Sequence, residues 1–326
     1  MDQKSLRSKV EFCSRLISKI KKEINKVVIG QQKVIDGLIR ALLANGHVLL
    51  EGVPGIAKTL LIRSLGKVTG CECKRIQFTV DLLPSDIIGI TTYTKEKGFT
   101  VIKGPIFANF ILADEINRSP PKTQSALIES MQESQVTIGK ETFPLPKPFF
   151  VMASQNPIET AGVYTLPEAQ VDRFLFKILM GYPKPEEEEK ILKNNITIKK
   201  FEEFDLKPLL SPSTIIEMQK ITKQIYTSKA VGRYIVKIVG ITRNPKGISL
   251  GRYLEWGGSP RASIGLFIAS KAQALIKGRT FVTPQDVKDV AYDVLRHRLL
   301  LNYEGQAENI KSDDIITEIL SKIPVP

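Results

Sequence analysis

The chain has 326 residues, of which 42% are hydrophobic and 25% charged, so it can bury a large core plus a smaller second domain and is not a disordered polymer. No run of about 18 apolar residues suggests a membrane span, and the N-terminus lacks an apolar signal-peptide core. We therefore expect a cytoplasmic protein. The three cysteines and two histidines predict neither a disulfide framework nor a zinc site.

The formal net charge of +13 can be explained in two ways. A basic surface suits a nucleic-acid partner. Lysines spread over solvated helix faces explain the same charge, and no lysine cluster is interleaved with the aromatic side chains that a base-stacking surface requires. We favour solvated faces and expect no specific nucleic-acid partner.

The first element, over residues 1–26, is predicted to be an amphipathic helix. Its apolar residues recur three or four positions apart from Leu6 to Ile24, which places them on one helical face. A coiled coil is an alternative, but the run is too short to favour it over packing on the main domain. A second helix is expected from about Gln32 to Ala44.

Residues 27–182 are predicted to form an α/β core. Short apolar strands alternate with helices, which predicts a doubly wound parallel sheet. The expected strands cover 47–51, 74–79, 108–115, 148–157 and 173–180. Two further segments, 91–104 and 134–145, alternate polar and apolar residues around a glycine, so we expect β-hairpins inserted into the core; Gly139-Lys140 suits a type II′ turn.

Beyond the core, two prolines and an acidic run predict a linker over 183–204, although the acidic run also suits the start of a helix. No buried-strand pattern follows residue 205. Residues 205–326 are therefore predicted to be a smaller all-helical lid domain.

The segment "GVPGIAKT" nearly matches the phosphate-binding loop G-x-x-x-x-G-K-[ST], with Ala57 where glycine is usual. It joins a buried strand to a helix, so its backbone N–H groups and the helix N-terminus can bind phosphate. Lys58 would bind the β- and γ-phosphates, and Thr59 would offer a hydroxyl to Mg²⁺. The predicted nucleotide-binding residues of this stretch are Gly52, Val53, Pro54, Gly55, Ile56, Ala57, Lys58, Thr59 and Leu60.

Two adjacent carboxylates follow the strand that contains "ILAD". Asp114 lies at its carboxyl end, where open α/β sheets bind ligands, and is a candidate for the Mg²⁺ shell with Thr59. Glu115 is a candidate for activating the attacking water; the alternative, two solvated acids, is disfavoured by the loop upstream. Asn156 ends the next strand and is equally compatible with binding the γ-phosphate and with a plain Asn-Pro turn.

These residues, in this order, resemble the Walker A, Walker B and sensor 1 elements of AAA+ ATPases. The phrases "GPIFANFILADEINRSPPKTQSALIESMQE", "QNPIETAGVYTLPEAQVDRF" and "SPRA" closely resemble the MoxR family over nearly the whole chain. Alanine before the lysine also occurs in MoxR-like loops. The resemblance implies a P-loop AAA+ core that uses ATP and Mg²⁺. It also equates the two hairpins with the helix-2 and pre-sensor inserts shared with magnesium chelatase, minichromosome-maintenance and dynein modules.

The resemblance assigns roles to three further places. Arg173 in "VDRF" matches an arginine finger that acts on a neighbouring subunit, with Arg118 in "EINR" as the rival for that contact. Arg261 in "SPRA" matches sensor 2, which we expect to act within its own subunit. Ile29 and Gly30 of "VVIGQ" are expected to line the adenine pocket.

The resemblance implies an ATPase that forms a ring, expected to be a hexamer, and remodels protein clients like a chaperone. A partner with a von Willebrand factor A domain is expected. The alternative is a nucleic-acid-stimulated motor, for which Lys95, Lys97 and Lys140 in the hairpins give weak support. A nucleotide switch without turnover is disfavoured, because Glu115 and Asn156 are both present.

Overall fold

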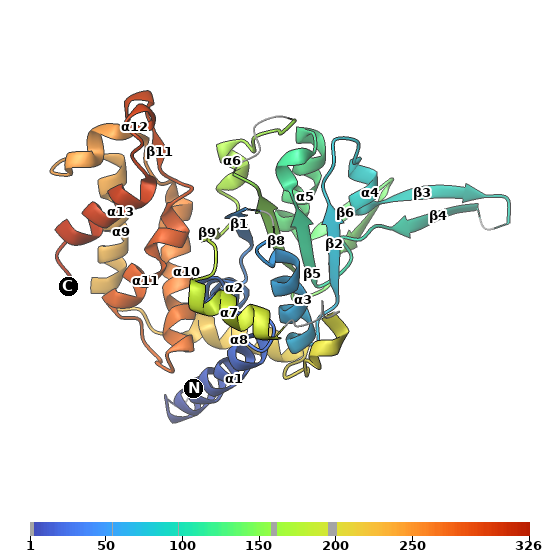
Figure 1. Cartoon of the computed structure of the whole chain (residues 1–326), viewed down its shortest axis with the longest axis horizontal. Coiled ribbons are helices and arrows are strands. Elements are labelled where there is room, and N and C mark those ends of the chain that lie inside the picture. The colour runs from blue at the N-terminus through green and yellow to red at the C-terminus, as the bar shows by residue number, and fades with distance from the viewer. Residues whose placement is uncertain (1–2, 54, 97, 158–161, 195–200) are drawn as a thin grey trace.

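The structure, a computed structural model, describes residues 3–53, 55–96, 98–157, 162–194 and 201–326. Pro54 and Lys97, which were singled out above, lie outside the described residues. Figure 1 shows a sheet-containing core at the centre, a group of C-terminal helices on one side and a long hairpin projecting on the other.

The core contains a five-stranded parallel sheet in the order β2-β5-β8-β1-β9. Each strand coincides with one of the five apolar runs, so the predicted doubly wound sheet is confirmed. The strands are β1 (Val48–Gly52), β2 (Cys73–Gln77), β5 (Phe110–Asp114), β8 (Phe150–Gln155) and β9 (Phe176–Met180).

Side chains alternate between the two faces of this sheet, and helices cover both. Leu50 packs into one hydrophobic cluster with α1 (Gln3–Ile24), α2 (Gln32–Leu43) and α3 (Lys58–Thr69). Leu49, one residue away, packs into the opposite cluster with α4 (Pro84–Ile88) and α5 (Pro121–Glu133). The result is a three-layer α/β/α sandwich whose strand ends remain accessible at both edges.

The N-terminal helix α1 is amphipathic, as predicted, and packs onto the rest of the chain. Its apolar residues Val10, Cys13 and Ile17 are at most 2% exposed. The helix contacts α3 in the core and also α8 (Pro212–Gln224) and α10 (Pro260–Ile276). Helix α1 therefore joins the core to the C-terminal helices.

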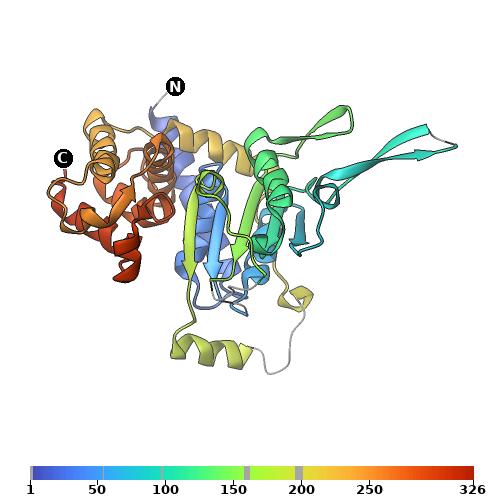
Figure 2. The same ribbon diagram turned by 90° about the horizontal axis from the view of Figure 1, so that it is seen from above.

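Two β-hairpins interrupt the α/β alternation where the sequence predicts them. Strands β3 (Gly89–Thr94) and β4 (Gly98–Lys103) form the first, and β6 (Gln135–Ile138) and β7 (Glu141–Pro144) form the second. Gly139 has a φ of 64°, as the first central residue of a type II′ turn requires. Figure 2 shows both hairpins projecting from the same side of the core.

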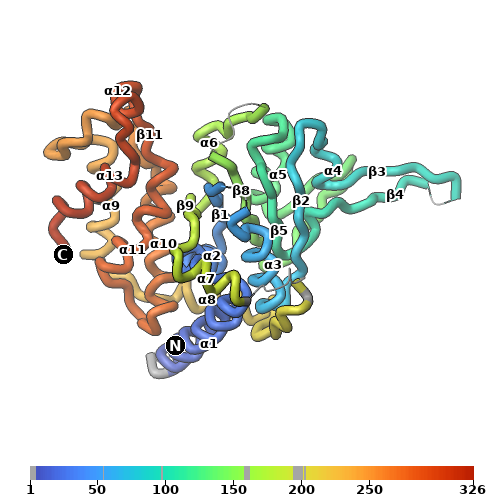
Figure 3. Tube along the Cα trace, viewed as in Figure 1, coloured from blue at the N-terminus to red at the C-terminus, as the bar shows by residue number. Residues whose placement is uncertain are grey.

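The C-terminal region is helical, as predicted, with one addition. Strands β10 (Leu254–Trp256) and β11 (Leu300–Leu301) form a small antiparallel ribbon, too short to leave a periodic signal in the sequence. Within the segment predicted as a linker, residues 185–194 form a helix. The remaining elements, which can be followed in Figure 3, are α6 (Glu168–Val171), α7 (Pro185–Asn194), α9 (Lys229–Arg243), α11 (Pro284–Leu295), α12 (Tyr303–Ala307), α13 (Ser312–Lys322) and the 3₁₀ turns Ile116–Arg118, Phe201–Phe204 and Ser249–Tyr253.

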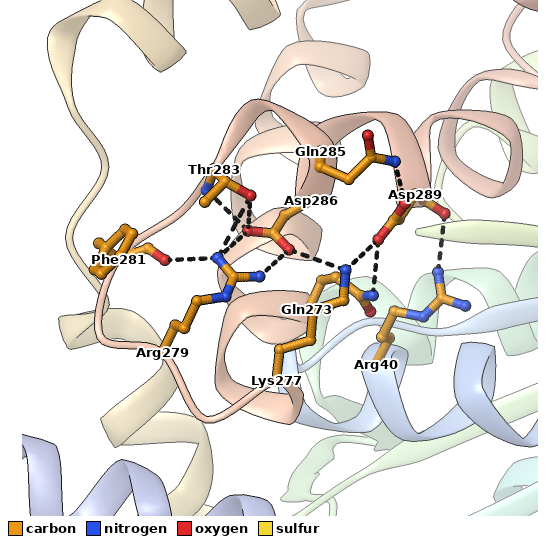
Figure 4. A network of polar contacts seen from close by, with 9 residues as sticks. All are labelled: Arg40, Gln273, Lys277, Arg279, Phe281, Thr283, Gln285, Asp286 and Asp289. Carbon is orange, nitrogen blue, oxygen red and sulfur yellow. Dashed lines mark hydrogen bonds and ion pairs between the residues drawn. The ribbon is translucent and has the colours of Figure 1, made fainter.

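A polar network at the start of α11 ties it to α10 and α2 (Figure 4). The fully buried Asp286 accepts both guanidinium arms of Arg279, at 2.6 and 2.8 Å, and the backbone N–H and hydroxyl of Thr283. Burial alone would raise the pKa of Asp286, but these hydrogen bonds outweigh it and lower the pKa. Arg40 of α2 donates to the Asp289 carbonyl one turn further along.

We expect Asp286→Ala to lower the free energy of unfolding by about 3 kcal/mol, because removing one member of a buried ion pair leaves its partner uncompensated. It also removes half of the capping box of α11, because Asp286 is the residue that accepts the N–H of the N-cap Thr283. Urea unfolding followed by circular dichroism measures the change. Gln285→Ala is the control, because Gln285 is on the same helix and donates an exposed hydrogen bond to Asp289. An equal loss in both variants would contradict the prediction.

Candidate functional site

The segment Gly52–Thr59 turns sharply from β1 into α3, which begins at Lys58. Gly55 and Ala57 have φ values of 83° and 65°. For an L-residue this left-handed conformation costs roughly 1–2 kcal/mol. Ala57 therefore holds the backbone conformation that glycine would adopt without strain, and the loop shape survives the substitution.

Lys58 is held at this loop. Its side chain is buried, and its amine donates to the carbonyl of Gly52 at the end of β1. The amine of Lys58 thus lies inside the loop, where it can contact an anion that the backbone N–H groups bind.

A cavity of about 530 Å³ lies beside this loop. It forms at the carboxyl ends of β1 and β5, where an open α/β sheet binds ligands. The cavity brings together most of the predicted loop residues and both predicted carboxylates. Its described lining consists of Gly55, Ala57, Lys58, Thr59, Leu60, Arg63, Asp114, Glu115 and Phe201.

The Asp114 carboxylate is fixed from two strands. Ser154 of β8 donates its hydroxyl to Oδ1 at 2.6 Å, and Arg75 of β2 donates to Oδ2 at 2.8 Å. The same Ser154 oxygen accepts the backbone N–H of Glu115 at 2.9 Å. The Asp114 carboxylate and the Thr59 hydroxyl, which line the same cavity, are hard oxygen donors of the kind that fits a magnesium ion.

Glu115 lines the cavity and has a φ of 56°, an uncommon conformation for a residue other than glycine. Gln77 donates to its Oε2 at 2.6 Å, and Arg118 lies 3.3 Å from the same oxygen. Sequence reasoning missed Gln77 and Ser154. The available signal was a polar residue at the end of a strand adjacent to the one that carries Asp114.

Asn156 follows β8, which lies between β5 and β1. The residue is 6% exposed, and it is not among the described residues that line the cavity. The predicted adenine residues Ile29 and Gly30 line a separate cavity of about 490 Å³ with α7 residues, including Glu187. That cavity also lies near the carboxyl end of β9, because Gln31 donates to the Gly181 carbonyl at 2.9 Å.

Arg173 and Arg261 lie together in a third cavity of about 520 Å³, at the opposite edge of the sheet. Its lining includes residues that precede β1, β8 and β9, and no residue of the Gly52–Thr59 loop among those described. Because parallel strands point the same way, their amino and carboxyl ends form different edges. This placement gives no support to the expectation that Arg261 acts within its own subunit.

His47 lies at the wall of this third cavity, partly buried just before β1. Its Nδ1 accepts the Val151 N–H at 3.1 Å, so Nε2 carries the proton and donates to the Met131 carbonyl. Burial lowers the pKa of His47 to about 4, from an ordinary value near 6.5. The His47 ring is therefore neutral in the folded state between about pH 4 and pH 6.5, whereas in the unfolded state it binds a proton over this pH range.

We expect the stability that His47 contributes to be complete above about pH 6.5 and to fall by roughly 1.4 kcal/mol per pH unit below it, down to pH 4. The thermal midpoint at pH 7.0 and 5.5 measures this. In His47→Gln the pH dependence should be shallower, because Gln cannot take up a proton. Equal slopes in the two proteins would contradict the assignment.

The fold, with the phosphate-loop cavity at one edge of the sheet and the arginine cavity at the opposite edge, defines the class of protein. Residues 47–176 match the family described as "ATPase family associated with various cellular activities (AAA)", and residues 251–319 match the AAA lid domain. The chain is thus an AAA ATPase, with a nucleotide-binding core and a helical lid.

Similarity to individual proteins narrows the class. The chain is 46% identical to the chaperone MoxR1 of Mycobacterium tuberculosis, over 93% of this chain and 81% of that one. It is 44% identical to YeaC of Bacillus subtilis, over 95% of each. A crystal structure of a Cytophaga hutchinsonii protein superposes with a TM-score of 0.91 at 44% identity, over 100% of this chain and 99% of that one. The chain belongs to the MoxR family of AAA ATPases.

None of the helices in the described ranges combines the length and apolar character needed to cross a membrane.

Proposed function

We propose that the protein hydrolyses ATP in a Mg²⁺-dependent reaction, as a ring of identical subunits that remodels protein clients. The observation that carries this proposal is the single cavity in which Lys58, Thr59, Asp114 and Glu115 meet. These are the groups needed to bind a triphosphate, hold a divalent cation and orient a water. Family membership supports the same activity.

Each residue has a distinct task in this proposal. The loop N–H groups and Lys58 hold the phosphates, while Thr59 and Asp114 hold the Mg²⁺ shell. When bound, Mg²⁺ neutralises charge on the phosphate oxygens. Glu115 accepts a hydrogen bond from the attacking water, and the amide of Asn156 orients that water or the γ-phosphate. Val53 and Ile56 belong to the loop itself, and Ile29 and Gly30, which line the separate cavity beside α7, would contact the adenine.

Arg173 and Arg261 are proposed to act on the nucleotide of a neighbouring subunit. They share a cavity at the edge opposite their own phosphate loop. They can therefore reach the nucleotide of a neighbouring subunit without any change of fold. Arg118 is a weaker candidate for this contact, because it pairs with Glu115 of its own chain. A subunit then supplies its cations to one neighbour and receives those of another.

We expect Arg173→Ala subunits to lose turnover and to regain part of it when mixed with Lys58→Ala subunits. The second variant cannot bind nucleotide but still presents Arg173. An arginine finger contributes about 10³–10⁵ in rate where it has been measured, so the recovery should be well above background in a phosphate-release assay. Absence of recovery at every mixing ratio, with assembly verified by size-exclusion chromatography, would exclude the trans role.

A hexamer, a protein client and a partner with a von Willebrand factor A domain complete the proposal. Support comes from similarity to a relative described as a chaperone. Pull-down with Glu115→Gln, which should hold ATP without turnover, would retain the client and partner for identification by mass spectrometry. Retention that does not depend on ATP would count against this function.

A nucleic-acid-stimulated motor is the alternative, favoured only by the net charge of +13 and the projecting hairpins. The deciding assay is ATPase rate with and without single-stranded DNA, duplex DNA or RNA at about 0.15 M salt, where charges are screened beyond about 8 Å. We expect no stimulation. Several-fold stimulation would instead assign Lys95 and Lys140 as nucleic-acid contacts.

A further inference from the structure

The backbone on both sides of Arg173 is bonded to the lid. Arg298, just after α11, donates from Nη2 to the carbonyls of Asp172 at 3.2 Å and Phe174 at 2.7 Å, and from Nη1 to that of Leu175 at 3.1 Å. Its Nε donates to Oδ1 of Asp172 at 2.7 Å. Arg173 is the residue between these anchors, and its own side chain is exposed.

Burial of Arg298 makes these hydrogen bonds energetically necessary. The Arg298 side chain is 3% exposed, and a buried guanidinium requires hydrogen-bond acceptors for its N–H groups. Apart from the Val294 carbonyl near the end of α11, its acceptors among the described residues belong to residues 172–175. The adjacent His297 also bonds to the Phe174 carbonyl, at 3.1 Å.

The start of α10 holds the same segment through the second oxygen of Asp172. Ser259 donates to Oδ2 at 3.0 Å, and Arg261 lies 3.6 Å from it. One carboxylate next to Arg173 is therefore shared between the beginning of α10 and the end of α11. Because both lid helices bond to this carboxylate, we expect a movement of either to shift the backbone around Arg173.

We infer that Arg298 is a positioning residue, which sets the place of Arg173 and makes the lid of one subunit control the arginine it presents to its neighbour. The inference rests on the proposed trans role of Arg173. Stabilisation of a transition state by a fixed charge depends on its exact aim, and a displacement of about 1 Å can cost roughly 10²-fold in rate.

Mixed assemblies separate positioning from folding. Donor subunits carry Lys58→Ala and supply Arg173; acceptor subunits carry Arg173→Ala and supply the nucleotide site. Adding Arg298→Met to the donor should lower the recovered turnover by about 10- to 100-fold. Adding it to the acceptor should leave the recovery nearly unchanged, because the acceptor uses only its carboxyl-edge cavity. A general loss of structure would impair both roles.

Arg296→Met is the matched control. Arg296 is also largely buried and also joins the end of α11 to the core, through the Lys177 carbonyl at 2.6 Å. Within the lid it pairs with Asp313 of α13 at 2.8 Å. Among the described residues it makes no hydrogen bond to residues 172–175, so a donor that carries Arg296→Met should recover turnover like the Lys58→Ala donor alone. Arg298→Lys, which keeps the charge but loses the planar fork, should behave like Arg298→Met and decides the matter if the methionine variant does not assemble.

Hydrogen exchange of a peptide covering 170–176 gives a second readout that needs no activity. We expect faster exchange in Arg298→Met than in the wild type or in Arg296→Met. The inference is overturned if the Arg298 donor recovers turnover fully, if donor and acceptor are impaired equally, or if exchange is unchanged. Absence of turnover in the wild type would instead refute the proposed function, while the exchange measurement would still test the contact.

Discussion

Lys58→Ala should abolish nucleotide binding at working concentrations. Lys58 is the one lysine in the described lining of the nucleotide cavity, and its amine already lies against the loop at the Gly52 carbonyl. Losing one member of a desolvated charge contact costs about 2–5 kcal/mol, which is roughly a 30- to 4,000-fold weaker affinity. Titration with a fluorescent ATP analogue measures the change.

Lys67→Ala is the control for this experiment. Lys67 lies on the same helix, α3, but is exposed at its far end and does not line the cavity. Its substitution removes the same charge from the chain and should leave affinity nearly unchanged. Equal weakening in both variants would show that net charge, and not the loop contact, governs binding.

Glu115→Gln should separate binding from turnover. The substitution keeps the side-chain shape and the possibility of a hydrogen bond with Gln77, but it removes the negative charge that draws a proton from water. Removing a general base typically costs about 10²–10⁴ in rate. ATP affinity should stay within the range of the wild type, so the loss should fall on kcat.

Single-turnover phosphate release with pre-bound ATP tests this directly. Glu129→Gln, an exposed substitution on α5 outside the cavity, controls for loss of a carboxylate. If Glu115→Gln hydrolysed ATP at the wild-type rate, the water-activating role would belong to another residue. A parallel fall in affinity would indicate instead a role in holding the cation.

The strands and hairpins could be predicted because their signals are local. Runs such as "HVLLEG" and "ANFILADE" are continuous apolar stretches, which sheets buried on both faces require. The turn at Gly139 needs only two residues to specify it. The ribbon of β10 and β11 was missed for the opposite reason, since its strands are two or three residues long and far apart in the chain.

The candidate site was predictable in part. The loop and the two carboxylates lie at or just after the carboxyl ends of two strands. The parallel sheet alone therefore brings them to one cavity, independently of how the other helices pack. The partners Gln77, Ser154 and Arg298 depend on register and on docking of the lid, which no local pattern encodes. The position of Arg261 is likewise a property of how α10 meets the sheet, so the sequence did not show at which edge it would lie.

The placement of the nucleotide cavity and the Arg173 cavity at opposite edges of one sheet limits the symmetry of any assembly that uses both. A twofold axis brings the same surface of two copies together, so it cannot join the donor edge of each copy to the acceptor edge of the other. Contacts must instead run head to tail. On the proposed roles, an open row of copies always ends in one nucleotide cavity without a donor, and only a closed ring fills every one.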